Sequence, residues 1–169
     1  DHLFEKDEDS RIPVVGVTGS RGKTPVARLI AHLSRLSGQY TGLACSEGVF
    51  LDGRQVETPE GTNWDAAERV LMNRSVEAAI FENSCRDILG DGTVYDRCSV
   101  GVVTNIAPEL HFGEFYIDTP EKVWNVFRTQ VDLVLASGCA VLNAEDPAVV
   151  EMAELCDGDV IFYGIDGQA

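Results

Sequence analysis

The sequence predicts an α/β fold, a doubly wound and mostly parallel sheet with helices on both faces. Short apolar runs alternate along the chain with segments of helical periodicity, the order that builds parallel strands joined by crossover helices. The runs PVVGV, AAIFE and CSVGVVTNI are also largely apolar, as is typical of strands buried on both faces. In such sheets, ligands bind beyond the carboxyl ends of the strands.

Turn residues and periodicity set the boundaries of the elements. Residues 1–12 are charged and unpatterned, so we expect a linker there and one domain over residues 13–169. Asp52-Gly53, between alternating residues, predicts a hairpin over residues 49–56. Strands are expected at 13–17, 40–46, 78–82, 98–106, 139–143 and 159–164, and helices at 24–37, 64–74, 119–136 and 146–155.

Three of these helices carry start or stop signals. Gly38 is a fitting stop for the first helix. Thr62 or Asn63 is expected to cap the second, while Thr119 caps the third and Pro120 takes its first position. The apolar residues at helical spacing in the first helix are Val26, Leu29, Ile30, Leu33 and Leu36.

Length and composition bound the class of protein. The chain has 169 residues, 44% hydrophobic and 24% charged, which suits one globular domain. Its net charge of −15 disfavours binding to nucleic acid or to an anionic membrane. The acidic N-terminal residues are unlike a signal peptide, and no apolar run approaches the roughly 20 residues that span a bilayer, so we expect a cytoplasmic location. Five cysteines without a Cys-x-x-Cys pair favour reduced, mostly buried thiols.

The stretch GVTGSRGKT, residues 16–24, follows the first expected strand and opens the first expected helix. That context is the one a phosphate-binding loop needs. Two glycines allow the backbone to turn its N–H groups inward, Lys23 would reach the β- and γ-phosphates, and the Thr24 hydroxyl would hold magnesium. The predicted nucleotide ligands are Gly19, Ser20, Arg21, Gly22, Lys23 and Thr24.

Two features of this stretch depart from the standard loop. The strict pattern has glycine where Val17 stands, and the glycine comes one residue earlier, at Gly16. Pro25 lies where the helix is starting, where its missing N–H is no loss to the helix, although one phosphate donor is gone. A strand-to-helix turn without a ligand is therefore the alternative interpretation.

The variant loop resembles that of the Mur ligase family, and most closely the Mur-like half of the cyanophycin synthetase branch. The resemblance covers about residues 12–165 and implies the central, ATP-binding domain of these enzymes. It implies ligation in which ATP phosphorylates a substrate carboxylate and an amine attacks the acyl phosphate. The ordered segments that carry it are IPVVGVTGSRGKT, ARLIAHL, GLACSEGVFLDGR, AAIFEN, YDRCSVGVVTNIAPE, IDTPE and AVLNAEDPAV.

The resemblance also implies roles for individual residues. Lys23 matches the loop lysine, Thr24 the magnesium-binding hydroxyl, and Glu82, at a strand end, the acidic magnesium ligand. A solvated strand-end carboxylate is the alternative for Glu82. The implied cofactors are ATP and magnesium, and the implied partners are the nucleotide and an amino-acid or peptide-polymer substrate. A homo-oligomer formed through a longer protein is compatible with this assignment.

The sequence departs from the family pattern at several positions. Pro25 replaces a second threonine, and ENSCRD at residues 82–87 replaces the Glu-Thr-Ala-Arg-Gly-Gly of cyanophycin synthetases. His111 takes the expected metal-linked histidine role only with a one-residue insertion, and otherwise is an exposed loop histidine. The family's metal-bridging lysine falls near Phe127, which puts a second metal in doubt.

Three functions remain open at this point. The first is the ATP-binding domain of a Mur-like amide ligase, expected to be an excised piece of a longer protein and inactive alone. The second is a degenerate domain that keeps the fold but has lost ligation and serves a structural or regulatory role. The third is an unrelated kinase or GTPase, which the absence of an Asn-Lys-x-Asp guanine motif disfavours.

Overall fold

The computed structural model describes residues 11–58 and 63–165. The expected linker lies outside the described residues except for its last two positions. The elements, with η for 3₁₀ helices, are β1 (Val14–Thr18), α1 (Lys23–Leu36), β2 (Thr41–Cys45), β3 (Gly48–Leu51), β4 (Arg54–Glu57), α2 (Trp64–Met72), β5 (Ala78–Glu82), α3 (Cys85–Gly90), β6 (Cys98–Val103), η1 (Gly113–Phe115), α4 (Pro120–Asp132), β7 (Val134–Asn143), α5 (Pro147–Val150), η2 (Glu151–Leu155) and β8 (Asp159–Tyr163).

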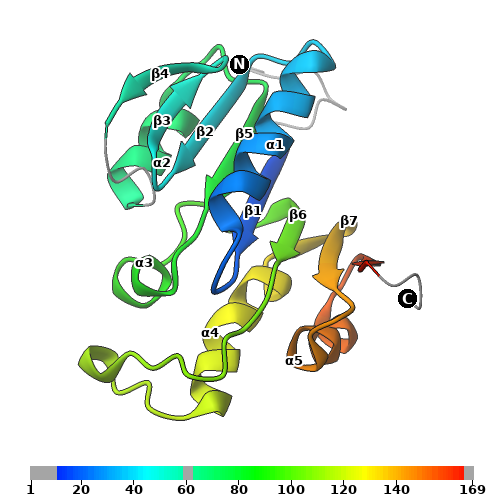
Figure 1. Cartoon of the computed structure of the whole chain (residues 1–169). Coiled ribbons are helices and arrows are strands. Elements are labelled where there is room, and N and C mark those ends of the chain that lie inside the picture. The colour runs from blue at the N-terminus through cyan, green and yellow to red at the C-terminus, as the bar shows by residue number, and fades with distance from the viewer. Residues whose placement is uncertain (1–10, 59–62, 166–169) are drawn as a thin grey trace, which may run out of the picture.

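The described strands form one sheet in the order β4-β3-β2-β5-β1-β6-β7-β8 (Figure 1). Six neighbouring strands, β2-β5-β1-β6-β7-β8, pair in parallel. The hairpin of β3 and β4 adds two antiparallel strands at the β2 edge. The hairpin turns at Asp52 (φ 47°) and Gly53 (φ 76°), and two successive positive φ angles are the signature of a type I′ turn. The predicted mostly parallel sheet and its hairpin are confirmed.

The order of the strands places a topological switch beside β1. From β1 the chain crosses to β2, returns to β5 next to β1, and then continues on the other side of β1 with β6. The carboxyl ends of β5, β1 and β6 therefore lie side by side, and the loops that follow them diverge. This is the place where open α/β sheets bind their ligands.

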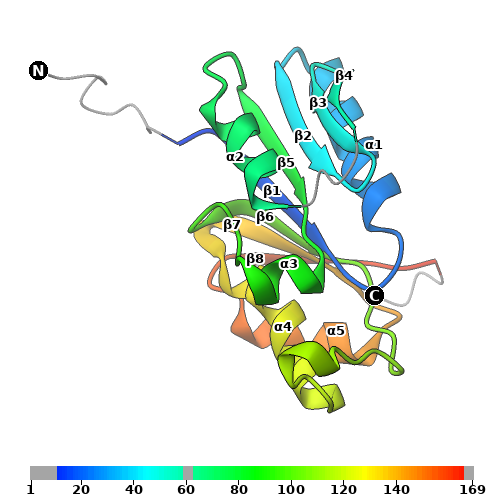
Figure 2. The same ribbon diagram turned by 90° about the vertical axis from the view of Figure 1, so that its left-hand side faces the viewer.

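Helices cover both faces of the sheet. Helix α1 packs over β1, β2 and β5, while α2, α4 and α5 pack on the opposite face (Figure 2). The buried residues of α1 are the small Ala27 and Ala31, which bring the helix close to the strands, and Val26 and Ile30 pack beside them. Three of the apolar residues expected to face the core, Leu29, Leu33 and Leu36, are instead 55–71% exposed.

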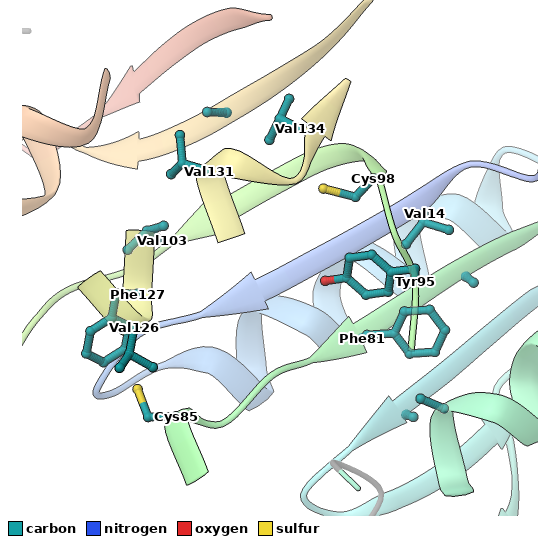
Figure 3. Packing of buried hydrophobic residues seen from close by; sticks show 14 of the residues in the cluster. Val14, Phe81, Cys85, Tyr95, Cys98, Val103, Val126, Phe127, Val131 and Val134 are labelled. Atoms are coloured by element: carbon teal, nitrogen blue, oxygen red, sulfur yellow. The ribbon is translucent and has the colours of Figure 1, made fainter. Parts of the chain in front are cut away.

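A buried polar cluster lies under β1 within the larger core. Tyr95 donates to Gln130 Oε1 at 3.0 Å, and Asn83 Nδ2 donates to Tyr95 at 2.5 Å and to Gln130 Oε1 at 2.7 Å. The Tyr95 ring stacks on Phe81, with centroids 5.5 Å apart (Figure 3). A Cβ on Gly16 would overlap with both Tyr95 and Gln130. The displaced glycine of the loop pattern therefore makes room for this cluster in the middle of β1.

Three elements differ from the sequence prediction. The helix expected at 146–155 is a short α-helix, α5, followed by the 3₁₀ helix η2. The helix expected to run to residue 136 ends at Asp132, because β7 begins at Val134, which pairs with Cys98 of β6, and pairing with β6 resumes over residues 139–142. The apolar periodicity continues through this boundary, so it could not reveal the change of element. Helix α3 was not predicted, although Ser84 caps it by accepting from Asp87 N, and the Ser-x-x-Asp pair is a recognisable helix start.

The other helix signals and the thiols agree with expectation. Asn63 caps α2 by accepting from Ala66 N, and Thr119 caps α4 by accepting from Lys122 N, with Pro120 in the first turn. All five cysteines are free, and Cys45, Cys85 and Cys98 are buried. Within the described ranges, no helix has the length and apolar character required to cross a membrane.

Candidate functional site

The loop between β1 and α1 has the backbone of an anion-binding turn. Gly19 adopts φ 136° and Gly22 φ 80°, conformations that favour glycine. At Gly19 there is no room for a side chain, because a Cβ would overlap with the Thr104 hydroxyl at the end of β6. At Gly22 the space is open, so only the backbone conformation requires glycine there.

Asn105 fixes the middle of this loop. Its backbone oxygen accepts from Ser20 N at 2.9 Å, and its Oδ1 accepts from Arg21 N at 3.1 Å. Its Nδ2 donates to Arg21 O at 3.0 Å, and the Thr104 hydroxyl donates to the same oxygen at 2.7 Å. The Ser20 hydroxyl accepts from Ala107 N at 2.7 Å. The N–H groups of Ser20 and Arg21, expected to bind phosphate, are thus already engaged by Asn105.

Four other N–H groups of the loop are free to bind an anion. Gly19, Gly22, Lys23 and Thr24 donate no backbone hydrogen bond to any described residue. The last two begin α1, where N–H groups have no partner inside the helix and the helix dipole favours negative charge. Pro25 follows at the third helical position, where its missing N–H breaks no helical bond, as predicted.

Lys23 supplies the positive charge of this turn. It is half-buried at the first position of α1, and its ammonium forms no ion pair or hydrogen bond with the described residues. Its charge acts on the buried Cys85 thiol of α3. Burial raises the pKa of Cys85 to about 12, and the Lys23 ammonium acts in the opposite direction. That thiol is therefore protonated at neutral pH, and Lys23 is available to an anion in the loop.

Thr24, Ser46 and Glu82 form a connected oxygen cluster beside the loop. The hydroxyls of Thr24 and Ser46 lie 2.9 Å apart, and Ser46 N donates to Glu82 Oε2 at 2.9 Å. Glu82 is the last residue of β5 and is only 4% exposed. Its other oxygen accepts no hydrogen bond from the described residues. Ser46 therefore links Thr24 to Glu82, and the Glu82 side chain is buried rather than solvated.

The cluster offers few protein ligands, and it therefore suits magnesium, which commonly takes its remaining ligands from water and phosphate. A hydroxyl and a carboxylate are hard oxygen ligands, and magnesium commonly keeps waters and phosphate oxygens in its remaining positions. Among the described residues, no group of three or more His, Cys, Asp or Glu side chains could hold a metal ion. The donor set present therefore fits an open magnesium site completed by a phosphate ligand.

His111 is not brought to this cluster. It is exposed, and its Nδ1 lies 3.2 Å from the backbone oxygen of Glu109. The same loop does reach the phosphate turn, because the Glu109 carboxylate pairs with the exposed Arg21 guanidinium at 3.2 Å. Arg21 thus directs its side chain toward the loop after β6. The described contacts join His111 to neither Lys23 nor Glu82.

The departures at residues 83–87 and at Phe127 have structural roles. Ser84 and Asp87 bond to each other as the cap of α3, and Arg86 pairs with Glu114 at 3.0 Å. Phe127 is fully buried in α4, and Figure 3 shows it beside Val126 and Cys85. An apolar ring therefore fills the position at which the resemblance implies a metal-bridging lysine.

The fold and the site define an α/β domain whose sheet carries, at its switch point, a glycine-rich turn with free N–H groups at the start of a helix. The chain belongs to the Mur ligase middle domain family, whose sequence model matches residues 17–169. Cyanophycin synthetase of Crocosphaera subtropica is 37% identical over 166 residues, which cover 98% of this chain and 19% of that protein. The UDP-N-acetylmuramoyl-L-alanyl-D-glutamate–2,6-diaminopimelate ligase of Chlamydia pneumoniae is 31% identical, and the match covers 95% of this chain and 33% of that protein.

Solved structures of related enzymes share the fold. A UDP-N-acetylmuramoyl-L-alanyl-D-glutamate–2,6-diaminopimelate ligase superposes with a TM-score of 0.74 at 18% identity, covering 94% of this chain and 33% of that one. Mycobacterium tuberculosis folylpolyglutamate synthase, solved with ADP and AMPPCP, superposes with a TM-score of 0.62 at 16% identity. The match covers 89% of this chain and 42% of that one. The chain thus spans about a fifth of the cyanophycin synthetases and under half of these other relatives.

Sequence reasoning missed two residues of the site, Ser46 and Asn105. Ser46 follows β2 directly, and β2 pairs with β5, so its position next to Glu82 follows from strand order. Asn105 follows β6, which pairs with β1, and it reaches the phosphate loop for the same reason. Both are polar residues just beyond an apolar run, and that was the available signal.

Proposed function

We propose that this chain is the magnesium–ATP-binding part of an amide ligase that resembles cyanophycin synthetase. The observation that carries the proposal is the contact of Thr24, Ser46 and the buried Glu82 beside the free N–H groups that open α1. The family membership and the names of the relatives support the same reaction class. Ligation itself is proposed for a protein of the relatives' full length.

The roles of the residues follow from their chemistry. The N–H groups of Gly22, Lys23 and Thr24 would cradle phosphate oxygens, and the Lys23 ammonium would neutralise charge at the β- and γ-phosphates. Thr24 and Glu82 would hold magnesium, with Ser46 fixing the Glu82 carboxylate. ATP would supply the phosphoryl group that activates a substrate carboxylate as an acyl phosphate, which an amine then attacks. The protein contributes positioning and charge neutralisation.

His111 is proposed as a further catalytic residue of the complete site. The role is the metal-linked one that the resemblance implies. The same loop contacts the glycine turn through the ion pair of Glu109 with Arg21.

The second candidate function is a domain that keeps the fold without ligating. Phe127 favours it, since a buried phenyl ring lies near the position where the resemblance implies a lysine that bridges two metals. Such a domain would bind phosphate weakly or not at all and would serve assembly. It differs from the first candidate in its response to ATP.

Calorimetric titration of the chain with ATP and magnesium tests the first proposal. We expect binding that needs magnesium and that weakens at least about tenfold in Lys23→Ala, because a charge-assisted contact to phosphate is lost. Lys122→Ala is the matched control, since among the described residues this exposed lysine pairs only within its own segment, with Asp118 and the Tyr116 backbone oxygen. Binding that Lys23→Ala leaves intact would refute the assignment of the loop. No binding by any folded variant would favour the degenerate domain.

A further inference from the structure

Glu82 lies between two residues of its own strand segment that are held from the opposite face of the sheet. Successive side chains of a strand point to opposite faces. Phe81 belongs to the larger core, on the side of α4, and Asn83 reaches the buried polar cluster on that same side. Glu82 points the other way, to Ser46 at the end of β2. Whatever fixes residues 81 and 83 therefore also fixes the direction of the carboxylate between them.

Tyr95, in the segment between α3 and β6, contacts both neighbours of Glu82. Its ring stacks on Phe81 with centroids 5.5 Å apart and an interplanar angle of 20°, and its hydroxyl accepts from Asn83 Nδ2 at 2.5 Å. Figure 3 shows the two rings beside each other next to β1. Burial raises the pKa of Tyr95, so the hydroxyl keeps its proton at neutral pH and donates it to Gln130.

Gln130 of α4 completes the hold on Asn83. Its side chain is fully buried, and its Oε1 accepts from Asn83 Nδ2 at 2.7 Å and from the Tyr95 hydroxyl at 3.0 Å. Its Nε2 donates to Cys98 Sγ at 3.5 Å. Both hydrogens of the Asn83 amide are used in this way. A buried network whose groups are satisfied makes the segment that it holds rigid.

The backbone of Asn83 is fixed as well. Its N–H donates to Val17 O at 2.8 Å, and its carbonyl accepts from the Thr18 hydroxyl at 2.9 Å. These two bonds tie the end of β5 to the end of β1, directly before the glycine turn. The peptide that follows Glu82 is thus held through both its backbone and its next side chain.

Stability alone does not require polar groups at this place. Apolar groups of the same shape are often as stabilising as a buried hydrogen-bonded pair. Directional hydrogen bonds add one defined geometry instead. We propose that Tyr95 and Gln130 are positioning residues, which fix the Glu82 carboxylate from the opposite face of the sheet. The consequence for magnesium rests on the function proposed above, whereas the positioning itself does not.

The first test needs no nucleotide. Ser46 N donates to Glu82 Oε2, so hydrogen exchange of the Ser46 amide, followed by NMR, reports where the carboxylate lies. Tyr95→Phe keeps the aromatic ring and removes the hydroxyl, and Gln130→Met keeps the length of the side chain and removes its amide. In each variant we expect the Ser46 amide to exchange about twofold to tenfold faster, the value of the hydrogen bonds lost.

Val131→Ala is the matched control for a general loss of stability. Val131 is fully buried in α4 next to Gln130, and the substitution removes only apolar packing. Ser46 lies in a turn, where amides exchange by local opening rather than by global unfolding, so the control should leave its exchange rate unchanged.

The second test separates an effect on magnesium from an effect on the loop. By calorimetry, Tyr95→Phe and Gln130→Met should weaken ATP binding in magnesium about twofold to tenfold and leave ATP binding in EDTA unchanged, because the loop N–H groups do not contact Glu82. In a Glu82→Gln background the same substitutions should have no further effect, since a positioning residue acts only through the group that it positions.

The outcomes distinguish this inference from the proposed function. Unchanged Ser46 exchange in both Tyr95→Phe and Gln130→Met, or an equal acceleration in Val131→Ala, would overturn the positioning role. So would a further loss of magnesium–ATP affinity in the Glu82→Gln background. If the unchanged protein does not bind magnesium–ATP, the proposed function fails, and the Ser46 exchange rates still decide the positioning role.

Discussion

The side chain of Asn105 holds both backbone groups of Arg21, with Oδ1 accepting from its N–H at 3.1 Å and Nδ2 donating to its carbonyl at 3.0 Å. The loop after β6 thereby fixes the peptide in the middle of the phosphate loop. The N–H groups left for an anion are those of Gly19 and of the three residues at the start of α1, Gly22, Lys23 and Thr24. The geometry of the phosphate site thus depends on a residue more than eighty positions away in the sequence.

Removing this side chain should loosen the loop. Asn105→Ala deletes two hydrogen bonds to Arg21, each worth about 0.5–1.5 kcal/mol, so the free energy of unfolding should fall by about 1–3 kcal/mol. Affinity for magnesium–ATP should fall in parallel, because the donors are no longer held in place. Urea unfolding and calorimetry measure the two effects. Asn105→Asp keeps the acceptor for Arg21 N–H but loses the donor to Arg21 O. Its free energy of unfolding should therefore lie between those of the unchanged protein and Asn105→Ala. An unchanged stability in Asn105→Ala would contradict the assigned role.

A side chain at Gly16 should destabilise the fold, although this residue lies in β1 and not in the turn that follows it. Gly16→Ala would push a methyl group into Tyr95 and Gln130, in a cluster buried from water, and overpacking of this kind costs about 1–3 kcal/mol. Gly90→Ala is the control, because no atom lies within 4 Å of its Cβ position and its φ angle is not in the left-handed region. Thermal or urea unfolding of the two variants checks the difference. Equal effects would show that the cluster can rearrange around the methyl group.

The buried thiols should make the protein less stable in alkali. Burial raises the pKa of Cys45 to about 11 and of Cys85 to about 12, from an ordinary value of 9.0. Folding raises both pKa values, so the thiols ionise more readily in the unfolded chain than in the folded one. Their contribution to the free energy of unfolding is therefore complete below pH 9 and is lost as the pH rises toward 11 and 12. Urea unfolding under reducing conditions should therefore give constant stability near neutrality and a decline above pH 9. Cys85→Ala should show a shallower decline, and an equally steep one would mean that other groups cause it.

Much of the fold was predictable because its signals are local. The apolar runs placed every parallel strand, Asp52-Gly53 placed the hairpin, and Thr119-Pro120 placed the start of α4. The end of α4 was predicted wrongly, since Val134 continues the helical apolar pattern while its backbone pairs with β6. The partner of a strand is a tertiary choice that local periodicity does not contain.

The same division applies to the site. From the sequence we predicted that the glycine turn, Lys23 and Thr24 bind phosphate and magnesium, because that chemistry requires these residue types where a strand meets a helix, and the family resemblance added Glu82. These roles stay predictions. Only the tertiary structure decided that Gly16 serves packing, that Asn105 occupies two of the loop's donors, and that Ser46 joins Thr24 to Glu82. The reason is physical: hydrogen bonds and steric contacts between distant segments depend on the order of strands in the sheet, and that order is set by packing the whole chain at once.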